Sequence, residues 1–144
     1  MSMKFLMQAL TTKIGGKIMP ALTVKGIPDA VGKESLNSLA YGLSSLVGNC
    51  LGLNTEEVSV FFPAGFLQQG LGEELICVVD GFFEKPERTT SVRHELAKTI
   101  LKILYEFSQK NLSMCNKVEV IVKRFNQDVD GFVVWDIKQI MEDR

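Results

Sequence analysis

The sequence predicts an α+β domain in which two consecutive βαβ units form one four-stranded mixed sheet with two helices on one face. Strand-like apolar stretches alternate with amphipathic helical stretches in the order βαβ, βαβ. The two units also align with each other at a constant offset, and 144 residues suit one domain with a substantial core. A right-handed crossover in each unit places both helices on the same side of the sheet.

The first unit is expected over residues 20–63. It opens with PALTVKGI, where apolar and polar residues alternate as in a half-buried strand. Asp29 is the expected N-cap of a helix from about residue 30 to 51, which Gly52 ends. EEVSVFFP then supplies the second strand.

The second unit is expected over residues 74–125. ELICVVDGFF is a nearly continuous apolar strand, as expected where both faces are covered. Asp80 interrupts it, either as a perturbed acid in a cleft or as the start of a turn or bulge with Gly81; the turn is the preferred reading. A helix with an apolar face from Val92 to Phe107 follows, and KVEVIVKRF is strand four.

Two further segments flank these units. Residues 1–19 are expected to form an N-terminal extension with an extra strand, because Gly15-Gly16 suits a hairpin turn. The tail, residues 126–144, is expected to turn at Asp130-Gly131 and to continue as a short apolar strand, which makes a C-terminal hairpin. Residues 20–144 are expected to form a single domain.

A shift of 60 residues aligns the two units, setting Leu36 on Leu96 in the helices and Val60 on Val120 in the strands. Duplication is the preferred interpretation, although any two amphipathic helices align at some offset. The uncovered face of the sheet has to be buried, and a closed homo-oligomer is the expected means.

Composition excludes several classes of function. With 16 Lys and Arg against 17 Asp and Glu, the net charge of −1 provides no basic field for nucleic acid. No apolar run approaches a membrane span and no export signal is evident, so we expect a cytoplasmic protein without membrane contact. The three cysteines form no CxxC pair, and nucleotide-binding and metal-ligand motifs are absent from the sequence, so no cofactor or metal is expected.

Tandem βαβ units, the first opening at Met19-Pro20, with a C-terminal hairpin resemble the tautomerase superfamily, which includes macrophage migration inhibitory factor and 4-oxalocrotonate tautomerase. The resemblance covers residues 19–135. It implies a homotrimer with a small-molecule pocket at each subunit boundary. It also implies that Pro20 is a catalytic amine and that Phe132, in Gly131-Phe132, lies at the pocket mouth.

The chemistry requires a free secondary amine at Pro20. An α-amino group has a pKa of about 7.7 to 8.0, and burial or a nearby cation lowers the pKa towards the range of a general base. While Met19 is attached, the nitrogen of Pro20 is a tertiary amide without a basic lone pair. Two hypotheses follow: a keto-enol isomerase that depends on exposure of Pro20, and a non-catalytic trimeric binding protein in which Pro20 stays blocked.

The remaining pocket residues depart from the family pattern. Ser59 stands where many family tautomerases carry an arginine for a substrate carboxylate, which weakens the case for a diacid substrate. Lys25 at the end of the first strand, and Lys123 with Arg124 at the end of the fourth, are the alternative cations for substrate binding. The competing reading makes each of them a solvated strand end. His94 is interpreted as a surface residue, because no Ser or Cys partner is placed beside it.

Overall fold

A computed structural model describes residues 20–63, 69–126 and 129–131. The chain divides into two parts: residues 19–125 form a sheet domain, and Asn126 with residues 129–131 belongs to the other part. Each part is described by itself. The elements of the sheet domain are β1 (Ala21–Lys25), α2 (Lys33–Leu51), the 3₁₀ turn η2 (Thr55–Glu57), β2 (Ser59–Phe61), β3 (Glu74–Asp80), α3 (Thr90–Asn111) and β4 (Lys117–Val122).

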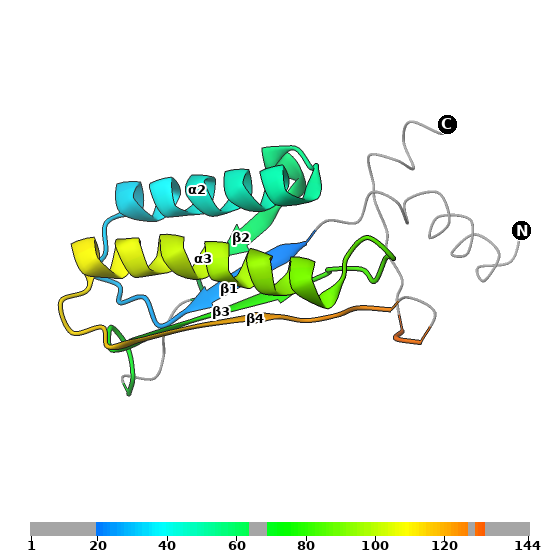
Figure 1. Ribbon diagram of the computed structural model, residues 1–144. Coiled ribbons are helices and arrows are strands. Elements are labelled where there is room, and N and C mark those ends of the chain that lie inside the picture. The colour runs from blue at the N-terminus through cyan, green and yellow to red at the C-terminus, as the bar shows by residue number, and fades with distance from the viewer. Residues whose placement is uncertain (1–19, 64–68, 127–128, 132–144) are drawn as a thin grey trace, which may run out of the picture. The chain divides into compact units, whose positions relative to one another are not determined.

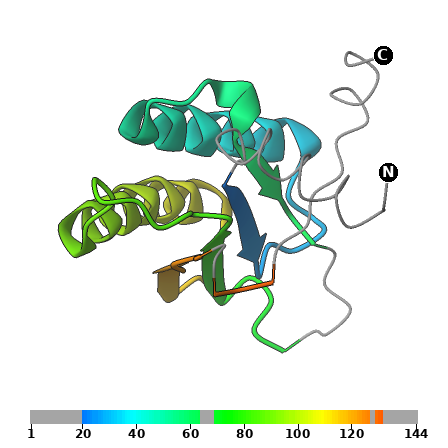
Figure 2. The ribbon, with the colours of Figure 1, turned by 90° about the vertical axis from the view of Figure 1, so that its right-hand side faces the viewer.

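The four strands form one mixed sheet in the order β2-β1-β3-β4. β1 runs parallel to β2 and β3 runs parallel to β4, whereas the central pair, β1 and β3, is antiparallel. Helices α2 and α3 lie side by side on one face of this sheet (Figure 1, Figure 2). The predicted four-stranded mixed sheet with two helices on one face is therefore confirmed.

The strand register supports the duplication. Leu22 of β1 lies opposite Val60 of β2, and Cys77 of β3 lies opposite Val120 of β4. The outer residues of these pairs, 60 and 120, are 60 apart, as the sequence alignment predicts, while the inner residues, 22 and 77, are 55 apart. The second unit is therefore five residues longer between its strands, and α3 with 22 residues against 19 in α2 supplies three of them.

The core lies between the helices and the inner face of the sheet. Its fully buried side chains include Leu22, Val24, Leu75 and Val79 from the central strands and Leu43, Val47, Leu96, Ile100 and Leu104 from the helices. Complete burial of one such side chain contributes about 1.5–3 kcal/mol relative to exposure. Because one helix of each unit packs on the shared central strands, the two units form one compact domain.

The outer face of the sheet is partly apolar and incompletely covered. Burial alternates along β3, so Ile76 and Val78 on the outer side are only half-buried. The expectation that β3 is covered on both faces is therefore wrong for the chain in isolation. Phe61 and Ile121 on the outer strands remain 57% and 45% exposed. An apolar face of this kind is expected to be buried by another molecule.

Two local expectations were wrong. Helix α2 begins at Lys33, since residues before it form a turn in which the Val31 N–H donates to the Pro28 carbonyl at 3.1 Å. Gly32 is the N-cap, without a side-chain bond, and Asp29 is exposed. The second strand is also shorter than expected, because a capping box between Asn54 and Glu57 holds Thr55–Glu57 as a helical turn.

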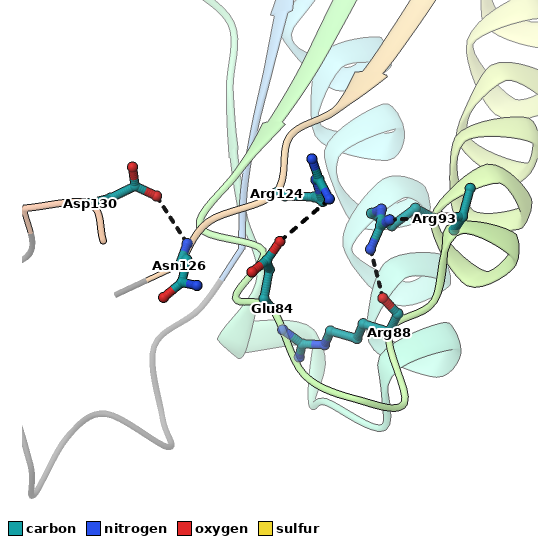
Figure 3. Close-up of polar contacts among 7 residues, drawn as sticks. Glu84, Arg88, Arg93, Arg124, Asn126 and Asp130 are labelled. Atoms are coloured by element: carbon teal, nitrogen blue, oxygen red, sulfur yellow. Dashed lines mark hydrogen bonds and ion pairs between the residues drawn. The ribbon is translucent and has the colours of Figure 1, made fainter. Parts of the chain in front are cut away.

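The tail carries backbone hydrogen bonds just before Asp130-Gly131, whereas the hairpin predicted at Asp130-Gly131 extends beyond the described residues. The Asp130 N–H donates to the Asn126 carbonyl at 2.7 Å, and the Asn126 N–H donates to the Asp130 carboxylate at 3.0 Å (Figure 3). The extra N-terminal strand and the apolar strand after Gly131 lie outside the described residues.

Candidate functional site

The antiparallel central pair gives the sheet two chemically different ends. Ala21 at the start of β1 lies opposite Asp80 at the end of β3, while Lys25 lies opposite Ile76. The start of β1 therefore shares one end with the β3–α3 connection and with residues 123–125, which follow β4 (Figure 1). We call this the Pro20 end, and the opposite one the Lys25 end.

Pro20 is buried next to the first residue of β1. Its carbonyl accepts a hydrogen bond from the backbone N–H of Ser59 at 3.2 Å, which begins the parallel β1–β2 pairing. Ser59, at the position where the family resemblance expects an arginine, is thus the neighbour of Pro20 in the adjacent strand. Its short hydroxyl side chain supplies no charge to hold a carboxylate.

Lys123 reaches the Pro20 end from strand four. Its N–H donates to the Val79 carbonyl at 3.1 Å, and its ammonium lies 3.9 Å from the carboxylate of Asp80. The two side chains are 60% and 55% exposed, so their attraction is weak and easily exchanged for another anion. Asp80 is the last residue of β3 and precedes Gly81, which has a φ of 73°. Parallel pairing with the fourth strand resumes at Phe83 and Phe125 with one extra residue on the β3 side, so the predicted break at Asp80-Gly81 is a bulge.

Arg88 organises the connection between β3 and α3. Its guanidinium donates to the Phe83 carbonyl at 2.9 Å and lies 4.6 Å from the centre of the Phe82 ring. Burial lowers the pKa of Arg88, and the charge of Glu87 opposes that shift. A guanidinium remains protonated in proteins, so Arg88 is a fixed cation against an aromatic ring.

Two more arginines gather beside this connection (Figure 3). Arg93, in the first turns of α3, donates to the Arg88 carbonyl at 2.7 Å and to the Thr90 hydroxyl at 3.1 Å. Arg124, following β4, lies 3.7 Å from the carboxylate of Glu84. Arg88, Arg93 and Arg124 lie at this end of the sheet with different partners, and we refer to the three residues as the arginine cluster. Guanidinium groups favour carboxylate or phosphate ligands.

The other predicted residues are distributed differently. Lys25 is exposed at the far end of β1, so the sheet separates it from Pro20 by the length of that strand. Phe132 lies outside the described residues. His94 is exposed on α3, and Cys77 is completely buried, where burial raises the pKa of its thiol to about 12. Pro20 and Lys123 are the predicted pair that the fold brings to one end.

Sequence reasoning missed Arg88 and Glu84. Both lie in FEKPERTT, which reads as a polar loop, and periodicity carries no information on where a loop returns in space. No local sequence signal was available, because it is the antiparallel pairing of the central strands that sends the connection after β3 back to the start of β1.

Among the residues that the structure describes, no group of three or more His, Cys, Asp or Glu side chains could hold a metal ion. Within the same residues, no helix has the length and apolar character needed to cross a membrane.

Comparison with known proteins rests on structure alone. No family model and no curated protein matches the sequence. A solved asymmetric trimer of wild-type fused 4-OT aligns with 83% of this chain and 98% of its own, at a TM-score of 0.58 and 15% identity. Pt0534 inactivated by 2-oxo-3-pentynoate aligns with 78% of this chain and 91% of its own, at 0.58 and 22%.

The chain has a tautomerase-like fold. The same fold occurs in a domain of unknown function (DUF1904) from Sebaldella termitidis, which aligns with 81% of this chain and 100% of its own at a TM-score of 0.52 and 16% identity. Proteins with a tautomerase-like fold therefore include some without an assigned activity. At identities of this size the similarity establishes the fold, and function has to be argued from the residues.

Proposed function

We propose that this tautomerase-like protein is a keto-enol isomerase for a small enolisable carboxylic acid when Pro20 carries a free amine. The observation that carries the proposal is that Pro20, Lys123 and the arginine cluster share one end of the sheet. Pro20 supplies the general base and the cations attract the carboxylate. While Met19 is attached, the same end binds the anion without turnover.

The charges at the Pro20 end suit both roles. Cations near a free Pro20 amine disfavour its protonated form, and so they lower its pKa towards neutrality. The side chains of Arg88 and Arg93 are already held by the Phe83 and Arg88 carbonyls, so they lose little freedom on binding an anion. Only Lys123 and Arg124 are anchored by exposed ion pairs that a substrate carboxylate can replace.

The alternative is a non-catalytic trimeric binding protein. It is favoured by Met19, which acylates Pro20 in this chain, and by Ser59 in place of an arginine. Both hypotheses include a homotrimer, supported by the half-exposed apolar face with Phe61 and Ile121 and by the trimeric assembly of fused 4-OT. Sedimentation of the full chain as a monomer would contradict both.

Turnover of phenylpyruvate enol separates the two hypotheses. We expect a chain that begins at Pro20 to catalyse ketonisation, and the full-length chain to lack this activity. Keeping Met19 on the shorter chain should reduce kcat by about 10²–10⁴-fold, the usual contribution of a positioned general base, because an acylated Pro20 nitrogen cannot accept a proton. Activity should rise with pH through the pKa of the amine, because only the unprotonated amine accepts a proton.

Lys123→Met tests the contribution of Lys123 to substrate binding, and Lys25→Met is its matched control. Lys123→Met should raise KM for phenylpyruvate with a smaller effect on kcat, whereas Lys25→Met at the opposite end should change neither. Turnover by the full-length chain that survives Pro20→Ala would rule out Pro20 as the base. Binding of phenylpyruvate without turnover by either chain would establish the alternative.

A further inference from the structure

A groove between α3 and β4 lies away from Pro20 and plays no part in the proposed isomerase. Its volume is about 440 Å³, within the range of small-molecule sites. On the helix side it is lined by Lys98, Leu101, Lys102 and Tyr105, and on the other side by Cys115 and Lys117. Leu101 and Tyr105 are 38% and 56% exposed, although both are large apolar side chains.

The charge of the groove is one-sided. Three lysines line it, and no Asp or Glu does. Two of the lysines pair with glutamates that do not line the groove: Lys98 lies 3.5 Å from Glu95, and Lys117 lies 2.6 Å from Glu119. Among the described residues Lys102 has no ion-pair partner. An adjoining hollow that shares Asn116 has the opposite character, since Glu73 and Glu74 line it without a cation.

The apolar and cationic side chains of the groove form rows that follow the axis of α3. Leu101 and Tyr105 are one helical turn apart, as are Lys98 and Lys102, so the four residues form two adjacent rows on α3. The stretch from Lys98 to Tyr105 is about 10 Å long. An extended apolar chain fits along Leu101 and Tyr105, and a carboxylate at its end comes within reach of Lys102.

We infer that the α3–β4 groove binds a medium-chain carboxylate of roughly the length of octanoate. The apolar chain covers the exposed side chains of Leu101 and Tyr105, and the carboxylate pairs with Lys102. A cationic or neutral ligand of the same length lacks the second interaction. An acidic peptide is a different partner, which the experiment below distinguishes.

Cys115 reports on occupancy of the groove. It is a half-buried free thiol in the lining, whereas Cys77 is fully buried and its pKa is raised to about 12. The full-length chain with Cys50→Ser leaves Cys115 as the reactive thiol, because the sequence has only three cysteines. Octanoate should slow alkylation of Cys115 by iodoacetamide in a saturable manner, which mass spectrometry measures.

Matched variants and ligands test the two interactions. Lys102→Glu should weaken octanoate about tenfold, through loss of one attraction and gain of one repulsion near the protein surface. Lys110→Glu, on the same helix but outside the groove, should leave it unchanged. Butanoate and octylammonium should each bind at least about tenfold more weakly than octanoate, since each lacks one of the two interactions.

Several results overturn the inference. These are alkylation unaffected by octanoate, equal effects of Lys102→Glu and Lys110→Glu, or equal protection by octylammonium. Protection by an acidic peptide at lower concentration than octanoate assigns the groove to a protein partner instead. A Cys115 that reacts only after unfolding, without octanoate present, shows that the groove is inaccessible in the folded protein. If Lys102→Glu fails to fold, Lys102→Gln and the comparison of octanoate with butanoate test whether the groove binds the carboxylate. Both measurements are independent of any turnover at Pro20.

Discussion

The two connections that lead from a central strand into a helix begin alike and then diverge. Gly26 follows β1 and Gly81 follows β3, 55 residues apart like Leu22 and Cys77, and both adopt a positive φ, 103° and 73°. The first connection then reaches α2 through Gly32, with no side-chain cap. The second is fixed by Arg88 and ends at Thr89, whose hydroxyl accepts from the Val92 N–H at 3.3 Å.

This difference shows where a duplicated fold can diverge. The strands and helices of both units share one core, so their spacing is constrained by packing. The connections lie at the surface, where charged side chains can be added without disturbing the core. The polar connection with its arginines lies at the Pro20 end, and the one with few charged groups lies at the Lys25 end.

The largest expected effect comes from the glycine that opens the first connection. In Gly26→Ala the new Cβ meets the backbone oxygen of Glu74 at 2.0 Å, in addition to the strained φ of 103°. We expect a loss of at least about 3 kcal/mol in the free energy of unfolding, measured with urea, because the start of β3 has to move.

Gly52→Ala separates the two causes. Gly52 has a φ of 70° but open space around its Cβ position, so only the conformational cost remains, about 1–2 kcal/mol. Equal losses in the two variants would show that the contact with Glu74 is relieved at no cost.

The second prediction concerns the pH dependence of stability that Cys77 gives to the second unit. Cys77 corresponds to Leu22 of the first unit, and burial raises the pKa of its thiol from 9.0 to about 12. Between these values the unfolded chain loses the thiol proton and the folded chain keeps it. Stability should therefore fall as pH rises above 9.0, by up to about 1.4 kcal/mol per pH unit.

Cys77→Val removes this titration while keeping an apolar side chain of similar size. The difference in unfolding free energy between the two proteins, measured from pH 8 to 11, cancels the titration of other groups. A difference that stays constant above pH 9.0 would contradict the prediction.

The smallest effect tests the arginine that distinguishes the second connection. Arg88→Met removes the hydrogen bond to the Phe83 carbonyl and the contact with the Phe82 ring, and should cost about 1–2 kcal/mol in chemical unfolding. Lys85→Met, an exposed residue of the same connection, should stay within about 0.5 kcal/mol. Similar values for both would indicate that Arg88 contributes no more than an exposed charge.

The sequence alone determined the order of the elements, most of their extents and the repeat. These are local or periodic properties: alternation in PALTVKGI, helical spacing from Leu36 to Cys50, and the 60-residue offset that the β2 and β4 register reproduces. Its errors lay where short-range hydrogen bonds outweigh periodicity, at the Pro28 turn before α2 and at the Asn54 capping box.

Only the tertiary structure decided which residues share a site. Whether the central strands run parallel or antiparallel cannot be inferred from their apolar patterns, yet this choice separates Lys25 from Pro20 and brings Lys123 and the β3–α3 connection to it. Likewise, no periodicity indicates that Arg88 turns back onto Phe82 and the Phe83 carbonyl. The physical reason is that pairing between distant strands depends on the packing of the whole chain, whereas sequence patterns report mainly the environment of neighbouring residues.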